Sequence, residues 1–136
     1  VKCVDVVFWQ GVIYTVQEFQ GGGDLAEMLI RWRRLPEATV KLVMVSLLHA
    51  VKELHDRDIV HRDLKPANLL LPASKTDRPT PSEEHWAHQL KLTDFGMAIT
   101  DTAAGCRSVC GSPLYMAPEV VRAKETHTPY GKACDL

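Results

Sequence analysis

An α+β fold is predicted by three features of the 136-residue chain: a hairpin pattern near its start, one strongly periodic helix, and a globular composition. Hydrophobic residues make up 46% of the chain and charged residues 24%, and the formal net charge is −1. These proportions are typical of a globular domain and exclude a disordered tail, a collagen-like repeat and a membrane bundle. The near-neutral charge gives no reason to expect nucleic acid or an anionic membrane as the main partner.

The length fits one ordinary domain and no more. The chain begins at Val1 rather than at Met and ends at Leu136 within a pattern, so we expect a piece of a longer protein. No apolar run approaches the roughly 18 residues that span a bilayer, so no membrane segment is expected. The four cysteines form no Cys-x-x-Cys pair, which favours reduced thiols and a cytoplasmic location.

The start of the chain is predicted to form a β-hairpin. Residues 4–8 and 12–16 are rich in β-branched and aromatic side chains, and Gln10-Gly11 between them is a turn signal. The three glycines at 21–23 then end the second strand.

Two helices are predicted after the glycines. Asp24 has Glu27 three residues later, the spacing of a capping box, which predicts a helix through about Arg34. Pro36 favours the first turn of a second helix, which ends near Asp58, a residue that tolerates a left-handed turn. Apolar residues form one stripe along this second helix: Val40, Val43, Leu47, Val51 and Leu54.

The rest of the chain is predicted to contain short elements only. Apolar stretches at 59–60, 69–71 and 90–93 are strand candidates. Residues 72–89 are rich in Pro, Ser, Thr and charge, which predicts an exposed loop. Residues 117–122 form a plausible short helix.

Three clusters of chemically capable residues follow one another along the chain. They are His-Arg-Asp-Leu-Lys-Pro-Ala-Asn at 61–68, Asp-Phe-Gly at 94–96 and Gly-Ser-Pro-Leu-Tyr-Met-Ala-Pro-Glu at 111–119. In this order they resemble the catalytic loop, the metal-binding loop and the end of the activation segment of a eukaryotic protein kinase of the serine/threonine branch. The resemblance covers essentially the whole chain. It implies a truncated protein-kinase-like fold, with two small-lobe strands and the mostly helical core of the large lobe.

The resemblance implies a catalytic group and a magnesium site. Phosphoryl transfer needs a carboxylate that orients and deprotonates the attacking hydroxyl, and Asp63 matches this catalytic base. Lys65 is placed to neutralise charge on the transferring phosphoryl group, and Ser112 matches the hydroxyl residue that contacts both. Asn68 and Asp94 match the Mg²⁺ ligands, whose oxygen atoms suit this hard cation. Outside these motifs, either aspartate would more often be a turn or capping residue.

The resemblance also implies an ATP site around the segment that links the two kinase lobes. Gln17 matches the gatekeeper behind adenine, and the backbones of Glu18 and Gln20 are expected to bond adenine. Asp24 would bond the ribose, and Leu70 would form the apolar floor under adenine. A strand followed by a helix cap describes the same atoms equally well.

Regulatory and structural residues follow from the same resemblance. Arg62 matches the receptor for a phosphorylated activation loop, and Ser108 aligns with the usual phosphosite, although an ordinary unmodified serine is an equal alternative. Glu119 closes the Ala-Pro-Glu motif, and Asp135 is expected to bond the backbone of the catalytic loop. The implied partners are protein substrates with Ser or Thr, and an upstream kinase unless the protein phosphorylates itself.

In domain terms, residues 1–136 are interpreted as a partial kinase domain. Residues 1–20 correspond to the end of the small lobe and the hinge, residues 21–136 to part of the large lobe, and 72–89 to an insertion. The hinge and activation segment look most like those of the autophagy-initiating kinases. The Gly-rich loop, strand lysine and partner glutamate of the family have no counterpart, so we expect the 136-residue chain alone to be inactive. The alternative is therefore a catalytically incompetent kinase fragment or a pseudokinase-like interaction module.

Overall fold

A computed structural model describes residues 1–73, 84–101 and 104–136. Its helices are α1 (Leu25–Trp32), α2 (Glu37–His55) and α3 (Pro118–Thr126). Its strands form three antiparallel pairs: β1 (Cys3–Trp9) with β2 (Val12–Gln17), β3 (Ile59–Val60) with β6 (Ile99–Thr100), and β4 (Leu69–Leu70) with β5 (Lys91–Leu92). The chain is thus an α+β mixture, as the sequence predicts. None of the helices in the described residues has the length and apolar character needed to cross a membrane.

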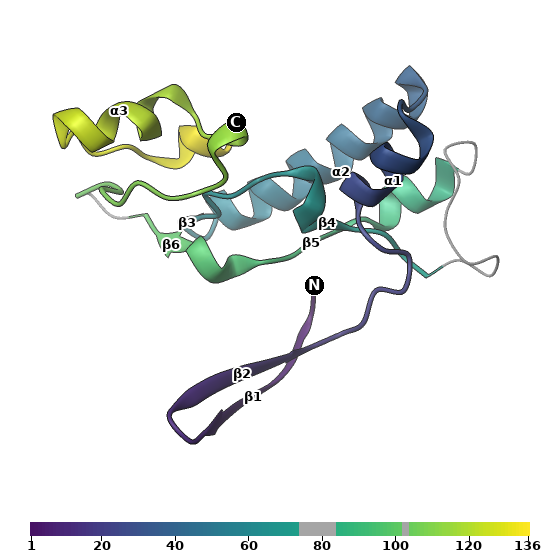
Figure 1. Cartoon of the computed structure of the whole chain (residues 1–136), viewed down its shortest axis with the longest axis horizontal. Coiled ribbons are helices and arrows are strands. Elements are labelled where there is room, and N and C mark those ends of the chain that lie inside the picture. Colours follow the sequence, from purple (N-terminus) through teal and green to yellow (C-terminus); the bar gives the residue numbers. More distant parts are fainter. Residues whose placement is uncertain (74–83, 102–103) are drawn as a thin grey trace.

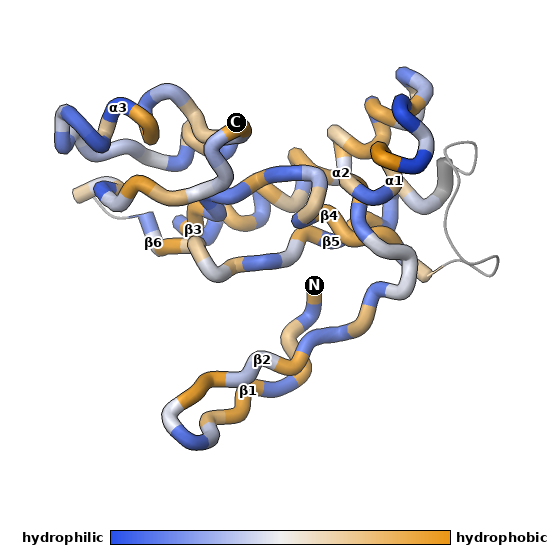
Figure 2. The backbone as a smooth tube through the Cα atoms, in the orientation of Figure 1, coloured by the Kyte–Doolittle hydropathy of each residue, from blue (hydrophilic) through white to orange (hydrophobic). Residues whose placement is uncertain are grey.

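The predicted hairpin is confirmed and stands away from the rest of the chain (Figure 1). Gln10 and Gly11 both have positive φ, at 48° and 80°, which suits the tight turn that right-twisted strands favour. Apolar residues recur along both strands (Figure 2), and most of them are exposed. Near the hairpin's end, Glu18 Oε1 accepts a hydrogen bond from Lys91 Nζ at 2.7 Å, which ties the segment after β2 to β5.

Helix α1 begins as predicted, because Asp24 Oδ1 accepts the Glu27 N–H at 2.8 Å. It ends two residues earlier than expected, at Trp32, since Arg33 has a φ of 65° and leaves the helical path. Its buried residues, Leu25 and Met28, face the main core.

Helix α2 packs the predicted stripe only in part. Val43 and Val51 are buried, but Val40 is exposed near the start of the helix, where no described element covers it. Pro36 precedes the helix instead of lying in its first turn. Asp58 has the predicted left-handed backbone, with φ 58°.

The expectation of an exposed loop over 72–89 is wrong at its end. Residues 84–89 form a short 3₁₀ helix on α2, and the Trp86 side chain is 0% exposed. Ser46 Oγ on α2 also donates to the carbonyl of Ala87 at 2.7 Å. The polar composition of this stretch gave no indication that the Trp86 ring belongs to the core. The rest of that prediction, over 74–83, lies outside the described residues.

The buried hydrophobic residues of the described chain form two separate clusters. The larger cluster lies between α1, α2 and the β4–β5 pair: Leu25, Met28, Val43, Leu69, Leu71, Trp86, Ala87 and Leu92. The smaller one lies between β3 and α3: Val60, Cys106, Val120, Ala123 and Tyr130. Because β3 pairs with β6 and β4 with β5, the loop over 61–68 lies beside the loop over 93–98. The strand pairs therefore bring two of the three sequence motifs together.

Candidate active site

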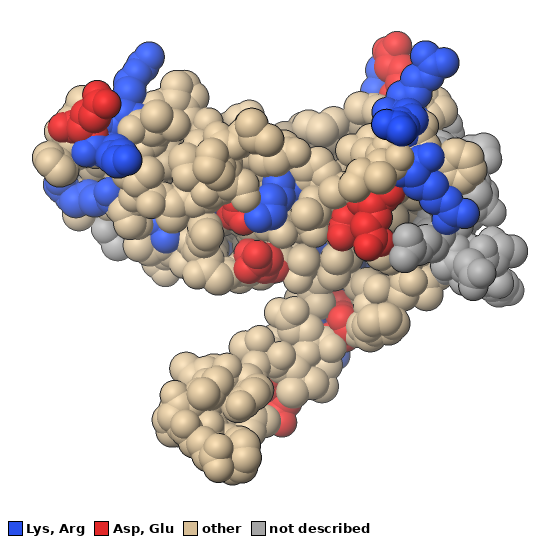
Figure 3. Space-filling view, in the orientation of Figure 1, with Lys and Arg blue, Asp and Glu red and all other residues tan. Residues whose placement is uncertain are grey.

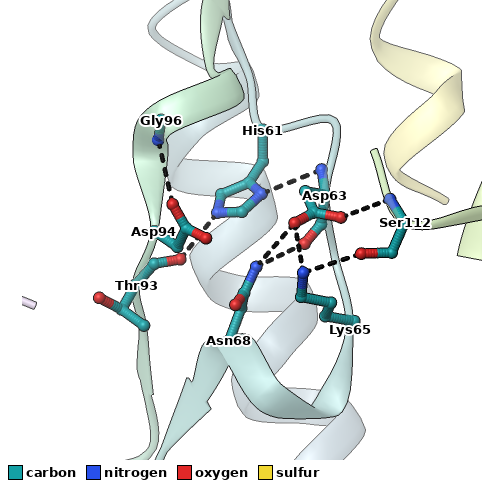
Figure 4. Close-up of polar contacts among 8 residues, drawn as sticks. All are labelled: His61, Asp63, Lys65, Asn68, Thr93, Asp94, Gly96 and Ser112. Carbon is teal, nitrogen blue, oxygen red and sulfur yellow. Dashed lines mark hydrogen bonds and ion pairs between the residues drawn. The ribbon is translucent and has the colours of Figure 1, made fainter. Parts of the chain in front are cut away.

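The Asp63 carboxylate is the centre of a polar cluster that joins the first and third motifs (Figure 4). Its side chain is 2% exposed. Oδ2 accepts hydrogen bonds from Lys65 Nζ at 2.7 Å and from Asn68 Nδ2 at 3.3 Å. Oδ1 accepts the backbone N–H of Ser112 at 2.8 Å. Four predicted site residues thus meet at one buried carboxylate.

The surroundings of Asp63 favour its ionised form. Burial acts to raise the pKa of the carboxyl, but the hydrogen bonds from Lys65 and Ser112 outweigh burial and hold the pKa below its usual value. The group is therefore a carboxylate at neutral pH. A carboxylate held in this way can accept a proton from a hydroxyl placed against it.

Lys65 bridges the carboxylate to the third motif. Its ammonium donates to Ser112 Oγ at 2.8 Å as well as to Asp63. Both partners are oxygen acceptors, so the charged nitrogen is fixed beside the carboxylate instead of sampling solvent. This agrees with the expected contact of Ser112 with both residues.

His61 connects the first motif to the second, a role that the sequence reasoning missed. Its ring is fully buried. Nε2 bonds the carbonyl oxygen of Thr93 at 3.0 Å, while Nδ1 accepts the Asp63 N–H at 3.3 Å. The ring also meets Phe95 edge-on, with centroids 5.1 Å apart. The only signal in the sequence was the position of this histidine at the head of its motif.

Asn68 and Asp94 offer oxygen atoms that fit a magnesium ion. Asn68 Nδ2 donates to the carbonyl oxygen of Asp63 at 2.8 Å, which fixes the amide and leaves its own carbonyl oxygen for a ligand. Asp94 has a left-handed backbone, with φ 61°, and one oxygen accepts the Gly96 N–H at 3.3 Å. Its second carboxylate oxygen bonds no described residue. An amide and a carboxylate oxygen are the hard donors that Mg²⁺ takes in proteins beside phosphate oxygens.

Arg62 and Ser108, the expected phosphate receptor and phosphosite, lie in direct contact. Arg62 Nη1 donates to Ser108 Oγ at 2.6 Å, and Arg62 Nε donates to the carbonyl of Met97 at 2.7 Å. Tyr130, which the sequence reasoning had not selected, joins this group: its hydroxyl donates to the Ser108 carbonyl and accepts from Arg62. Burial raises the pKa of Tyr130, so the phenol stays a proton donor.

Asp135 bonds the backbone of the catalytic segment, as the resemblance implies. Oδ2 accepts the His61 N–H at 2.8 Å and bonds His55 Nε2 at 3.0 Å, while Oδ1 accepts the Arg62 N–H at 2.8 Å. By contrast, the Glu119 side chain makes no hydrogen bond or ion pair with the part of the chain that the structure describes. Its structural role stays a prediction.

The five residues expected around ATP form no hydrogen bond with the Asp63 cluster among the described residues. Gln17 ends β2 and is exposed, and Leu70 is half-buried on β4 opposite Asp24. The Glu18 N–H donates to the Lys2 carbonyl at 3.0 Å, so only the Glu18 carbonyl is left for a ligand. The Gln20 N–H bonds no described residue. Asp24 caps α1 through one oxygen, which is the alternative that the sequence left open.

Comparison with known proteins agrees with this geometry. The profile of the protein kinase domain family matches residues 1–136. The chain is 37% identical over 126 residues to serine/threonine-protein kinase ATG1c of Arabidopsis thaliana, covering 92% of this chain and 16% of that protein. It is 43% identical over 122 residues to the ovarian-specific serine/threonine-protein kinase Lok of Drosophila melanogaster, covering 89% of this chain and 24% of that protein.

A human relative gives the same picture. The chain is 39% identical over 113 residues to serine/threonine-protein kinase ULK1 of Homo sapiens, covering 82% of this chain and 10% of that protein. The chain therefore spans between a tenth and a quarter of the length of these three relatives.

Proposed function

The chain belongs to the protein kinase domain family, and from this premise we propose that its natural protein is a serine/threonine kinase that transfers the γ-phosphate of ATP to protein hydroxyl groups. The observation that carries the proposal is the buried Asp63 carboxylate, bonded at once by Lys65, Asn68 and the Ser112 N–H. One acceptor group is thereby fixed by residues from two distant segments.

In the proposed reaction, Asp63 accepts the proton of the substrate hydroxyl as its oxygen attacks the γ-phosphorus. The bond from that phosphorus to the bridging oxygen breaks, and ADP leaves with the electron pair. Lys65, 2.7 Å from Asp63, stabilises the negative charge that develops on the transferred group. Because Ser112 bonds both Asp63 and Lys65, it is proposed as the residue that positions these two groups against the substrate hydroxyl.

Asn68 and Asp94 are proposed as the residues that hold Mg²⁺. When bound, the ion would offset the charge of the ATP phosphates. The proposal is supported by the anchoring of the Asn68 amide on Asp63, which turns its hard oxygen away from the carboxylate.

The nucleotide is proposed to bind along residues 17–24. The Glu18 carbonyl and the Gln20 N–H would supply one acceptor and one donor for adenine, and Gln17 would be the gatekeeper. Asp24 would offer its second carboxylate oxygen to the ribose, and Leu70 would supply apolar contact for the base.

Phosphorylation of Ser108 is proposed to regulate the site. Its hydroxyl oxygen lies 2.6 Å from Arg62 Nη1, so a phosphate there would form a charge-assisted pair with a residue adjacent to Asp63. Either an upstream kinase or the protein itself would add the phosphate. We also propose a cytoplasmic location, which is supported by four free cysteine thiols.

The test is phosphate transfer by the natural chain that contains residues 1–136, with ATP, Mg²⁺ and peptides that differ only in a Ser, Thr or Tyr acceptor. Asp63→Ala is expected to lower transfer to Ser and Thr by about two to four orders of magnitude, the range for a positioned base. Glu53→Gln, on the exposed side of α2, is the matched control and should leave the rate unchanged.

Two outcomes would contradict the proposal. Transfer that survives Asp63→Ala nearly intact would overturn the role of the carboxylate. Absence of transfer by the unmodified protein, together with retained binding to a protein partner, would favour the interaction-module alternative instead.

A further inference from the structure

The last residues of α1 and the start of the turn that follows present an exposed sequence, Ile30-Arg31-Trp32-Arg33-Arg34, which we term the basic turn. All five residues are exposed, and the Ile30 side chain is 76% exposed although it is apolar. In the space-filling view, lysine and arginine side chains gather over this end of the α1–α2 pair (Figure 3). The net charge of the whole chain is only −1, so the positive charge here is local.

Among the residues that the structure describes, the arginines of the basic turn differ from the basic residues of α2 because they form no ion pair with an acidic side chain. Within the described residues, α2 pairs its exposed cations at a spacing of four: Lys41 with Glu37, Lys52 with Asp56, and Arg57 with Glu53. No such ion pair involves any arginine of the basic turn among the described residues. These guanidinium groups therefore keep their donors for another molecule.

Arg33 ends α1 with an exposed side chain and a backbone conformation that is unfavourable for a residue with a Cβ. Its φ is 65°, a backbone region in which residues with a Cβ are strained, and its N–H closes α1 on the Leu29 carbonyl at 2.8 Å. Helices commonly end in this way with glycine. Glycine would fit this backbone with less strain, so an Arg33→Gly change removes the guanidinium without a cost to the fold.

Arg31 and Trp32 form a prepared contact. The Arg31 guanidinium lies 5.6 Å from the centroid of the Trp32 ring, within the range of a cation–π interaction. Such contact limits the freedom of the guanidinium before any partner arrives, which lowers the entropic cost of binding. Trp and Arg are also the residue types that contribute most at protein interfaces.

We propose that the basic turn is a docking site for an acidic segment of a partner protein, rich in Asp and Glu and with one apolar side chain. The peptide carboxylates would form bidentate hydrogen bonds with Arg31, Arg33 and Arg34. The apolar side chain would pack against Ile30 and Trp32. This inference is independent of the kinase activity proposed above.

The small extent of the positive charge favours a peptide over an anionic membrane. Glu37 lies three residues after Arg34 and pairs with Lys41 at 2.8 Å, so the unpaired positive charge of the described residues here is confined to the arginines of the basic turn. An extended negative surface gains little from so few side chains, whereas a peptide can place its carboxylates directly on them.

The first test measures binding of a labelled synthetic peptide, rich in Glu and Asp with a central Leu, to the natural chain by fluorescence anisotropy. The double variant Arg33→Glu, Arg34→Glu is expected to weaken binding at least about tenfold, which corresponds to about 1.4 kcal/mol. Arg122→Glu, Lys124→Glu on α3 makes the same change in charge at the far end of the chain (Figure 1) and should change the affinity less than about twofold.

A second variant separates binding from folding. Arg33→Gly removes the guanidinium but suits the positive φ, so the unfolding temperature should hold or rise while peptide affinity falls about threefold or more. Unchanged affinity in both basic-turn variants would overturn the proposal. Equal binding of a peptide with Gln and Asn in place of Glu and Asp would also overturn it, as would binding to phosphatidylserine vesicles without binding to the acidic peptide.

Discussion

Asp135 accepts the backbone N–H of His61, 74 positions earlier in the chain, at 2.8 Å. Its other carboxylate oxygen accepts the next backbone N–H, that of Arg62, at the same distance. One buried carboxylate therefore fixes two successive peptide groups just before Asp63. The position of the candidate base therefore depends on a residue that does not contact Asp63 itself but holds His61, whose ring accepts the Asp63 N–H.

Asp135→Asn is expected to destabilise the fold by about 1–3 kcal/mol, because an amide NH₂ would replace one of two oxygens that accept buried N–H groups. The free energy of unfolding, measured in urea, checks this value. The rate of phosphate transfer should fall as well, since the Asp63 loop loses its support. Glu53→Gln, exposed on α2, should change the unfolding free energy by less than about 0.5 kcal/mol.

At low pH, protonation of the Asp63 carboxylate should contribute to a decrease in the free energy of unfolding. Burial acts to raise the pKa of its carboxyl, but the bonds from Lys65 and Ser112 give a net lowering from the usual value of 3.8. A folded pKa below the unfolded one means that the stabilisation is complete above pH 3.8 and is lost as pH falls through the folded pKa. Asp63→Asn should therefore flatten the loss of stability below that pH in urea unfolding curves. Lys65→Met should instead move the loss to higher pH, and identical curves for all three proteins would contradict this interpretation.

Gly111→Ala tests how closely the third motif approaches the catalytic loop. Gly111 has a φ of 111°, and an added Cβ would lie 2.6 Å from the Arg62 carbonyl oxygen. Gly11→Ala is the matched control, since its φ is also positive, at 80°, but no atom lies within 4 Å of the added Cβ. Both changes strain the backbone, by about 1–3 kcal/mol. Gly111→Ala should lower the thermal unfolding temperature more than Gly11→Ala does. Equal decreases would show that the contact with the Arg62 carbonyl is unimportant.

Trp86→Ala should be among the most costly single changes in the core. The side chain is 0% exposed, and loss of a buried tryptophan typically costs about 3–5 kcal/mol. Trp9→Ala removes the same group from an exposed site on β1 and should cost less than about 1 kcal/mol. Calorimetric unfolding of the two variants gives the comparison, and similar losses would place Trp86 outside the core.

The Glu18–Lys91 pair should contribute little to global stability despite its 2.7 Å distance. Its side chains are 27% and 39% exposed, and exposed pairs typically couple by about 0.2–1 kcal/mol. A double-mutant cycle with Glu18→Gln and Lys91→Met measures the coupling energy. Because Lys91 holds the segment proposed to bind adenine, Lys91→Met should raise the KM for ATP more than it changes kcat, and Lys91→Arg should restore most of the loss.

The sequence predicted best where spacing is short and chemistry is specific. Asp63, Lys65 and Asn68 lie within six residues, so their convergence follows from one loop. The Asp24 cap of α1 also follows from its local spacing with Glu27. The contact of Ser112 with Asp63 spans 49 positions and was predictable only through the resemblance of whole motifs.

The features that the sequence did not predict depend on tertiary contacts, which a local pattern of residues does not specify. Trp86 is one apolar residue in a polar stretch, and its burial depends on the space beside α2. The link from His61 to Thr93 depends on which short strands pair, and strands of two residues carry almost no signal of their partners. Tyr130 belongs to the Arg62–Ser108 group through a tertiary contact of the same kind.

The β1–β2 hairpin sets how the chain behaves at high concentration. It exposes a set of large apolar side chains: Val4, Val6, Val7, Phe8, Trp9, Val12, Ile13, Tyr14 and Val16. Within the described residues β1 and β2 pair with each other alone, so in the 136-residue chain this sheet presents unpaired backbone groups along its outer edges. Apolar surface next to an open strand edge favours pairing between chains, so self-association should begin at the hairpin while the helical core is still folded.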